Sequence, residues 1–473
     1  MSESNRQTAG QASAMDMIVQ YFKDFGILKR NARSYWSIQV VNFIDLTAYF
    51  AMIAVLTLFL TENIGMTDEI SGYTVGSFTA IITIALLFTG FWTDMLGIRK
   101  AALLGMSLQG ISRIGIVYCG FFPETPYAGW IVAGLLLPTA FGAAMTQTVY
   151  QAANKRFSTL ESRGASFNLW YLIMNLGGVA GGLLIDLIRK DLNLDITWIL
   201  SLAVIAWLLS LVVIMGFISD EEALDQGDEE EETDQRSGWE RFKDLVKQST
   251  FWRFIALMCS VLGVRAVYSY LYLLLPLYWV RVIEEVTGQK TDMGFLQALN
   301  PILIVAGLIL MIPLSNKFNV FKMLVFGALI SALSLLFLVV PWELFGDDMA
   351  KSYFMMSVCM LVVLSIGEVF WSPKLYEYTA TVAPKGQEGS YLGFSMMPWF
   401  LAKTIVGFMS GHMLVRWVPE GIGTQIQAGT VAFWDSPEAM WLLLFIWAIS
   451  GPLLAWLFRH WITKDVDFGN GKK

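Results

Sequence analysis

The charged turn at residues 90–100 reads Gly-Phe-Trp-Thr-Asp-Met-Leu-Gly-Ile-Arg-Lys. It separates two apolar runs, near residues 72–95 and 101–121. Each run is as long as the roughly 20 mostly apolar residues that cross a bilayer as one helix. A short charged turn between two such runs is typical of two membrane helices that meet at one membrane surface.

The same turn predicts a latch at that surface. Gly90 and Gly97 permit close helix approach, and Asp94 can cap or pair with the end of a neighbouring helix. Arg99 and Lys100 would stay on the positively charged side of the membrane. We therefore assign Asp94, Arg99 and Lys100 to gating. The alternative is an ordinary charged turn.

Further apolar runs of the same length lie on both sides of this turn. They predict an all-α membrane protein with twelve transmembrane helices in two six-helix bundles. The expected spans are 36–60, 72–95, 101–121, 127–152, 164–188, 196–219, 253–281, 294–317, 321–341, 352–381, 389–416 and 438–462. The expected units are a cytoplasmic segment 1–35, a bundle 36–219, an acidic and amphipathic linker 220–252, a bundle 253–462 and a tail 463–473.

Composition excludes most other classes of protein. The 473 residues are 56% hydrophobic and only 15% charged, against roughly 25% charged in soluble domains. The net charge of −7 arises largely from the acidic run at 221–234, and no basic face for nucleic acid exists. The three cysteines lie in apolar runs, and the two histidines are far apart, so we expect no disulfide framework, metal site or cofactor.

Other sequence features exclude enzymatic and ATP-driven functions. No cluster of His, Cys or Ser forms a catalytic constellation, and no phosphate-binding loop of the G-x-x-x-x-G-K-[ST] type occurs. The N-terminal region has no signal peptide with a cleavage site, so the first helix is expected to remain attached. Paired glycines at 177–182 and at 407 and 411 predict close helix crossings.

Several pieces of the sequence resemble known transporters. The turn at 90–100 resembles the G-x-x-x-D-x-x-G-x-R-K signature of the major facilitator superfamily. Phe167 to Gly178, Gly367 to Pro373 and Trp399-Phe-Leu resemble elements of the proton-dependent oligopeptide transporters. The resemblance implies that Glu368 contacts a peptide's amino group and that Asn175 contacts its backbone.

The sequence also departs from that family. Where the family has E-x-x-E-R in its first helix, this chain has Asn42-Phe-Ile-Asp45-Leu46, followed by Tyr49. The lysine of the fourth helix falls at or near Thr146. Two cations expected to hold a peptide's carboxylate are therefore absent. The resemblance implies a divergent relative, and the family's solute cannot be assigned to this chain.

Charged residues inside the spans predict the functional site, because each is costly in a bilayer and usually faces a cavity or a partner. On helical spacing, several of them share faces with polar and aromatic residues. Asp45 and Glu368 are the expected proton-coupling pair across the two halves. The expected solute-binding residues are Asp45, Tyr49, Gln147, Tyr171, Asn175, Arg265, Tyr268, Glu368, Trp399 and Lys403.

Structural roles compete with functional ones at some positions. Arg113 is expected to form an interhelical salt bridge rather than to contact solute. Lys374 and Glu377 are three residues apart, so they either form an ion pair that closes the cytoplasmic end or contact solute. For Glu368, Arg265 and Lys403, the alternative to lining a cavity is pairing within the second bundle.

The leading interpretation is a secondary transporter of a small peptide-like, zwitterionic or anionic solute by alternating access, with proton symport. The alternatives are an efflux pump for amphipathic compounds, favoured by the aromatic content of 14%, and a receptor or assembly factor that does not transport. The expected partners are the solute, H⁺ and the lipid bilayer, with no nucleic acid. We expect a multi-pass plasma-membrane protein, which would be the inner membrane in a bacterium, and a monomer.

The distribution of Lys and Arg predicts the orientation. With a cytoplasmic N-terminus, 21 of the 32 Lys and Arg residues fall on the cytoplasmic side and six on the other side. Both termini are then cytoplasmic. A cysteine placed in the 220–247 linker should resist membrane-impermeant maleimide in intact cells and react after permeabilisation. Labelling of intact cells at this position would contradict the orientation.

Overall fold

The computed structural model describes residues 25–159, 161–224, 246–311, 319–382 and 388–464. Helices form nearly all of these segments, with short connections between them. Most of the predicted cytoplasmic N-terminal segment, linker and C-terminal tail therefore lies outside the described residues.

The first bundle contains six long helices. They are α2 (Arg33–Leu58), α3 (Asp68–Leu96), α4 (Ile98–Phe121), α5 (Ala128–Arg156), α6 (Arg163–Asp186) and α7 (Thr197–Phe217). α2 continues through a π-helical segment, η3 (Phe59–Asn63), and α6 continues through another, η4 (Leu187–Asp191). Two short 3-10 helices flank them, η2 (Phe25–Arg30) and η5 (Asp220–Glu222).

The second bundle also crosses six times. Its first crossing is divided into α9 (Ser249–Ser260) and α10 (Leu262–Leu273), and the others are α13 (Met293–Met311), α14 (Val320–Leu333), α15 (Met349–Val382), α16 (Glu388–Trp417) and α18 (Pro437–Leu457). The short connecting elements are α11 (Leu275–Trp279), η6 (Val280–Glu284), α12 (Glu285–Thr287), η8 (Ser334–Leu338), η9 (Trp342–Phe345), α17 (Ile422–Gln427), η10 (Phe433–Asp435) and α19 (Arg459–Ile462).

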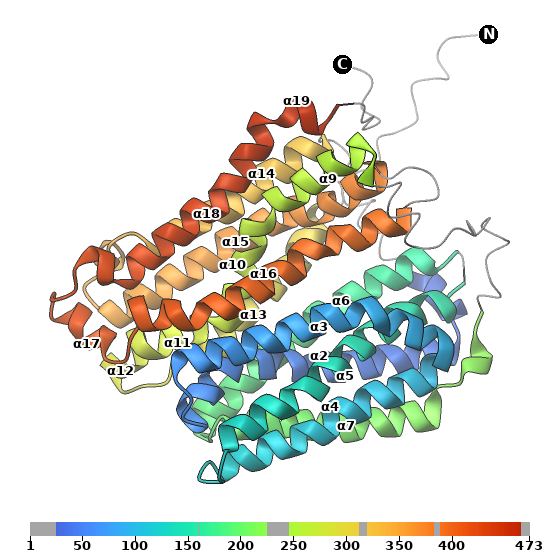
Figure 1. Ribbon diagram of the computed structural model, residues 1–473, viewed down its shortest axis with the longest axis horizontal. Coiled ribbons are helices and arrows are strands. Elements are labelled where there is room, and N and C mark those ends of the chain that lie inside the picture. The colour runs from blue at the N-terminus through green and yellow to red at the C-terminus, as the bar shows by residue number, and fades with distance from the viewer. Residues whose placement is uncertain (1–24, 160, 225–245, 312–318, 383–387, 465–473) are drawn as a thin grey trace.

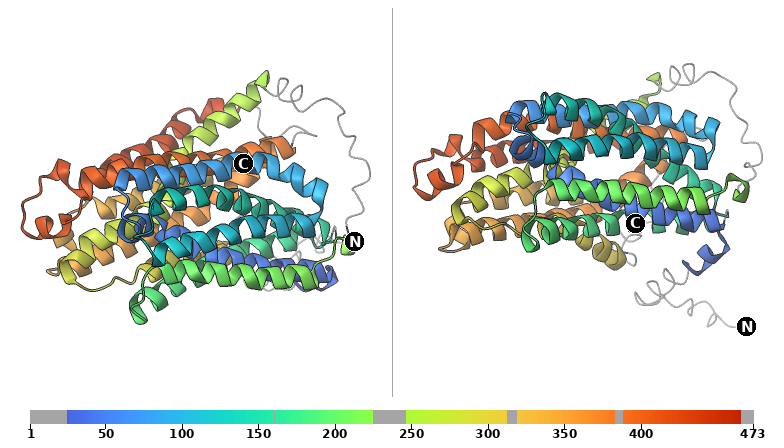
Figure 2. Two further views of the ribbon diagram at one scale, coloured as in Figure 1. Left: turned by 60° about the horizontal axis from the view of Figure 1, so that its bottom comes forward. Right: turned by 90° about the horizontal axis from the view of Figure 1, so that it is seen from below.

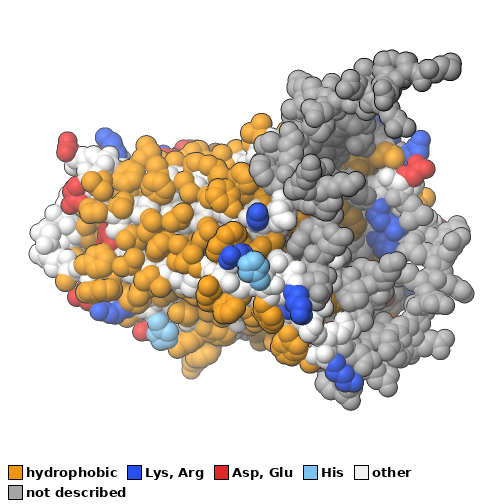
Figure 3. Space-filling model, turned by 90° about the horizontal axis from the view of Figure 1, so that it is seen from above, with side chains coloured by type: hydrophobic (Ala, Val, Ile, Leu, Met, Phe, Trp, Pro, Cys, Tyr) orange, Lys and Arg blue, Asp and Glu red, His pale blue; other side chains and the backbone are white. Residues whose placement is uncertain are grey.

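The prediction of an all-α membrane fold is confirmed. In the described part of the chain, eleven helices are long and apolar enough to cross a membrane. α16, with 30 residues, supplies the twelfth crossing. Hydrophobic side chains cover much of the described surface seen in Figure 3, with a few Lys, Arg and His side chains among them. This is the distribution that a lipid-facing surface requires.

The predicted span 253–281 is the one that differs most from the structure. The helix is interrupted at Val261 and again at Leu274. Pro276 explains the second interruption, because proline lacks an N–H and its ring clashes with the preceding turn. Side chains satisfy two carbonyls there: Gln297 donates to Leu271 O at 2.5 Å and Thr57 of the first bundle donates to Leu273 O at 3.1 Å.

The two bundles lie side by side, with α3 against α16 and α6 against α13 (Figures 1 and 2). Glycines allow both approaches. A Cβ added to Gly182 would lie 2.5 Å from the carbonyl oxygen of Gly294, and one on Gly407 would lie 2.5 Å from the Cα of Gly76. Gly178 with Gly182 and Gly407 with Gly411 therefore mark crossings between the bundles, whereas Gly177 and Gly181 pack against α2 within the first bundle.

Polar side chains join the bundles at the end where α12 and α17 lie, here named the α17 end (Figure 1). Arg281 donates to both carboxylate oxygens of Asp68, at 2.8 and 2.9 Å. Asp186 accepts from the backbone N–H groups of Gly294 and Phe295, each at 2.6 Å. Two further ion pairs connect the bundles, Arg189 with Glu284 and Lys190 with Asp292. We name these contacts the polar layer.

No equivalent layer is present at the opposite end within the described residues. The charged pairs there stay inside one bundle, as in Asp94 with Arg156 and Lys374 with Glu377. Among the described residues, the ion pairs that join the two bundles therefore lie at the α17 end.

Removing a cation from the polar layer should destabilise the protein. In Arg281→Gln, the buried Asp68 carboxylate loses a partner whose side chain is only 4% exposed. Breaking a buried ion pair costs about 3–5 kcal/mol, so the thermal melting midpoint in detergent should fall clearly. The matched control is Arg30→Gln, which breaks the Arg30–Glu161 pair, 66% and 68% exposed, and should cost below about 1 kcal/mol. Equal shifts in both variants would contradict a structural role for the layer.

Candidate functional site

Three charged side chains from different helices meet on one bundle. Arg265 comes from α10, Glu368 from α15 and Lys403 from α16. The Arg265 guanidinium carbon lies 4.4 Å from the centroid of the Trp371 ring and 5.1 Å from that of Trp399. Lys403 Nζ lies 4.7 Å from the Trp399 ring. We name Arg265, Glu368, Trp371, Trp399 and Lys403 the charged cluster.

The Glu368 carboxylate is held by an amide from the neighbouring helix α13. Asn300 Nδ2 donates to Glu368 Oε2 at 3.1 Å and to Ser365 Oγ at 3.0 Å. Glu368 is buried, and Arg265 interacts with it electrostatically without forming a close ion pair. The predicted alternative of a salt bridge from Lys403 or Lys374 to Glu368 is absent among the described residues.

Tyr268 supports the cluster from within the second bundle. Its hydroxyl lies 3.1 Å from Ser331 Oγ and donates to Leu364 O at 3.3 Å. Trp371 Nε1 in turn donates to Tyr268 Oη at 3.4 Å. The buried tyrosine thereby fixes the tryptophan ring that faces Arg265, and its role in solute contact stays a prediction.

α6 brings two predicted residues of the first bundle to the same region. Tyr171 packs against a small apolar cluster that includes Val369, the neighbour of Glu368. Asn175 is buried and donates to Tyr171 O at 2.9 Å. A Cβ on Gly178, one turn further along, would lie 3.1 Å from Pro301, the residue after Asn300. The structure therefore places the α6 residues beside the helix that binds Glu368.

Asp45 belongs to a different network. Its carboxylate accepts from Tyr150 Oη at 2.9 Å, and from Gln109 Nε2 and Thr146 Oγ1 at 3.3 Å each. Arg113 Nη1 lies 3.7 Å away. The expected salt bridge of Arg113 is present, and the coupling of Asp45 to Glu368 stays a prediction; the structure shows no direct contact between these two carboxylates. Four partners from α4 and α5 hold the carboxylate inside the first bundle.

The remaining predicted solute-binding residues, Tyr49 and Gln147, form fewer contacts in the structure. Tyr49 is half-buried one turn after Asp45 and contacts Phe50 edge to face, with ring centroids 5.7 Å apart. Phe50 in turn contacts Tyr272 across the two bundles at 5.8 Å. Gln147 is half-buried on α5, and the structure shows no side-chain hydrogen bond for it.

The predicted gating residues form local contacts. Asp94 pairs with Arg156, the last residue of α5, at 2.9 Å. Lys374 and Glu377 form the expected ion pair at 2.5 Å. Arg99 donates to Met215 O at 2.6 Å, and Lys100 is exposed.

Sequence reasoning missed a residue that completes this turn. Asp220 accepts from the backbone N–H of Ile98 at 2.8 Å and caps α4 beside Gly97, whose φ of 80° favours glycine. The sequence assigned Asp220 to the linker, as its first residue.

Two other missed residues could have been found. Asn300 precedes Pro301 inside an apolar run, which is the pattern of a polar residue facing a site. Trp371 stands within the helix 10 string that carries Glu368. No group of three His, Cys, Asp or Glu suited to a metal ion occurs in the described part of the chain.

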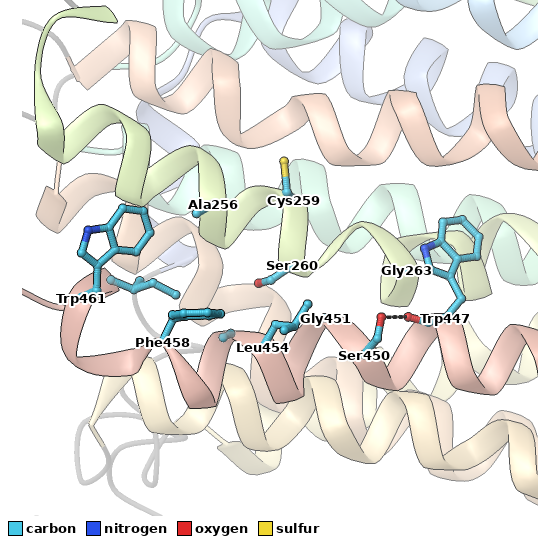
Figure 4. Close-up of a pocket in the computed structure, with 12 residues that line it drawn as sticks. Ala256, Cys259, Ser260, Gly263, Trp447, Ser450, Gly451, Leu454, Phe458 and Trp461 are labelled. Atoms are coloured by element: carbon cyan, nitrogen blue, oxygen red, sulfur yellow. Dashed lines mark hydrogen bonds between the residues drawn. The ribbon is translucent and has the colours of Figure 1, made fainter.

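A groove on the outer side of the second bundle is separate from the charged cluster. It lies between α9, the start of α10 and α18–α19, and its volume is about 320 Å³ (Figure 4). No charged residue lines it, and small residues such as Gly263 and Gly451 form much of its wall. It holds none of the predicted site residues.

Comparison with known proteins agrees with this architecture. The family model of the Major Facilitator Superfamily matches residues 38–407. A POT family transporter in complex with 5-aminolevulinic acid has a TM-score of 0.70 and 16% identity, over 92% of this chain and 97% of that one. An auto inhibited POT family peptide transporter has a TM-score of 0.67 and 15% identity, over 93% and 99%.

A further POT family transporter, in complex with a thioalcohol conjugated peptide, has a TM-score of 0.69 and 16% identity, over 91% of this chain and 97% of that one. No curated protein matches the sequence. At these identities the structural likeness establishes the fold alone. The family model, however, spans most of the chain. The chain therefore belongs to the major facilitator superfamily, and it is a transporter rather than an enzyme.

Proposed function

We propose that this protein is a secondary active transporter that moves small peptide-like solutes by alternating access, coupled to proton symport. The observation that carries the proposal is the charged cluster of the second bundle, where Tyr171 of the first bundle packs against Val369, the neighbour of Glu368. A site between two bundles near mid-membrane is where such carriers bind their solute.

The polar layer supports alternating access. It ties the bundles at the α17 end, while in the described chain no ion pair links them at the other end. With both termini in the cytoplasm of a plasma-membrane protein, this conformation is closed toward the outside. Breaking the layer and closing the opposite end would expose the site to the other side, by rocking about the glycine crossings.

Glu368 is the proposed proton and solute site. A buried carboxylate in a membrane is costly unless a proton, a cationic group or a hydrogen-bond donor compensates it. Asn300 supplies one neutral donor and Arg265 a nearby charge, which leaves room for a proton or a solute amine. Competition between these two for one carboxylate couples their movements. Asp45, already held by four partners, is not part of this exchange.

Peptides are the first solutes to test. Structural neighbours were solved with a thioalcohol conjugated peptide and with 5-aminolevulinic acid, and these small molecules suit a site of this charge and size. The aromatic lining, with Trp371 and Trp399 at the cluster and Phe50 against Tyr272, also favours the second candidate, efflux of amphipathic compounds. Uptake of labelled di- and tripeptides into proteoliposomes separates the two.

Glu368→Gln should uncouple transport from the proton gradient. The amide keeps the shape and the contact with Asn300 but cannot titrate. Accumulation of labelled dipeptide driven by an imposed pH gradient should be abolished in proteoliposomes, while exchange of labelled for unlabelled dipeptide continues. Glu343→Gln, which changes an exposed carboxylate outside the site, serves as the matched control and should accumulate normally.

The result that would contradict this role is gradient-driven accumulation by Glu368→Gln at the wild-type level per folded molecule. In that case, Glu368 would be a structural residue that stabilises the second bundle through Asn300.

A further inference from the structure

The two cations of the charged cluster form no ion pair in the described chain. Arg265 is only 4% exposed, its Nε is buried without a hydrogen-bond acceptor, and its guanidinium forms no ion pair. Lys403 contacts the Trp399 ring and also forms no ion pair. Other buried cations differ: Arg113 has Asp45, Arg189 has Glu284 and Arg281 has Asp68.

Aromatic rings compensate these charges only in part. A ring face attracts a cation, but the attraction is weaker than that of a hydrogen-bonded carboxylate in the same environment. Glu368 supplies one carboxylate for two cations, and Asn300 already occupies one of its oxygens. The cluster therefore has a surplus of one positive charge, and of two when Glu368 carries a proton.

We propose that Arg265 and Lys403, around the ring of Trp399, bind the carboxylate of a small organic anion that does not need a free amine. The charge surplus defines the class of ligand, and the geometry defines its size. Both cations lie within 5.1 Å of the same ring centroid, so they are at most about 10 Å apart. The two acidic groups of a small solute, or one carboxylate with a neighbouring polar group, span such a separation.

The first bundle offers no competing anion site at this depth. Its one mid-span cation in the described chain, Arg113, is taken by Asp45, and the residues facing the cluster, Tyr171 and Asn175, are neutral. The carboxylate of the solute would thus be bound by the second bundle alone. The first bundle would then bind the uncharged remainder of the solute by hydrogen bonds and ring contacts.

This inference rests on the proposed function for the location of the solute, but it can be tested by binding alone. Three probes share the Ala-Ala backbone and differ in the charge at their ends: N-acetyl-Ala-Ala is an anion, Ala-Ala a zwitterion and Ala-Ala-amide a cation. Titration calorimetry on the purified full chain should give binding of the first two. The amide should bind at least about tenfold more weakly, because it lacks the charged acceptor. Equal affinity for the amide, or no binding of the acetylated probe, would overturn the proposal.

Variants distinguish an anion site from structural use of the cations. Arg265→Gln and Lys403→Gln should each weaken N-acetyl-Ala-Ala binding about 10- to 100-fold. Neither should clearly lower the melting temperature of the ligand-free protein, because neither side chain forms an ion pair in the described chain. Arg416→Gln is the control, because Arg416 also lies over a tryptophan ring, Trp417, but is half-exposed and pairs with Asp435.

The outcomes separate the inference from the proposed coupling. A lowered ligand-free melting temperature in Arg265→Gln and Lys403→Gln, with unchanged probe affinity, would show that the cations are structural and would overturn the inference. Normal discrimination among the probes, with no uptake driven by a pH gradient, would refute proton symport and leave the anion site standing.

Discussion

The organisation of this protein follows from the cost of placing charge inside a membrane. An ionised side chain at mid-span is tolerated when a partner compensates it, and most buried charges here have one. Asp45 and Arg113 neutralise each other within the first bundle, and Arg281 and Asp68 do so between the bundles. Against that background, Arg265 and Lys403 stand out, because rings rather than carboxylates surround them.

The ion pairs between the bundles and the unpaired cations Arg265 and Lys403 have different roles. Pairs between the bundles lie at the α17 end, beside the glycine crossings of α6 with α13 and α3 with α16. They hold one conformation together through contacts that can be broken without unfolding either bundle. The unpaired cations lie at the middle of the molecule, where a solute could compensate them. Solute binding would then change the charge balance of the second bundle, and bundle movement would break the ion pairs between the two bundles.

Sequence alone predicted the twelve crossings, since apolar runs of sufficient length have no other stable fold. It also selected Arg265, Glu368, Trp399 and Lys403, because polar residues in apolar helices are rarely accidental. It did not identify the partners of Asp45 on α5, which depend on how that helix is rotated. It gave no sign of the ion pairs of Arg189, Lys190 and Arg281, because these depend on the docking of two bundles, which no local pattern encodes.

The most direct measurement is an experimental structure of the protein with N-acetyl-Ala-Ala bound. Our account predicts density between the bundles, with the carboxylate oxygens at hydrogen-bond distance, roughly 3 Å, from the Arg265 guanidinium and Lys403 Nζ. It also predicts Tyr171 or Asn175 in contact with the uncharged part of the molecule. A carboxylate bound at Arg113 in place of Asp45, or a ligand found only in the outer groove between α9 and α18, would contradict the account.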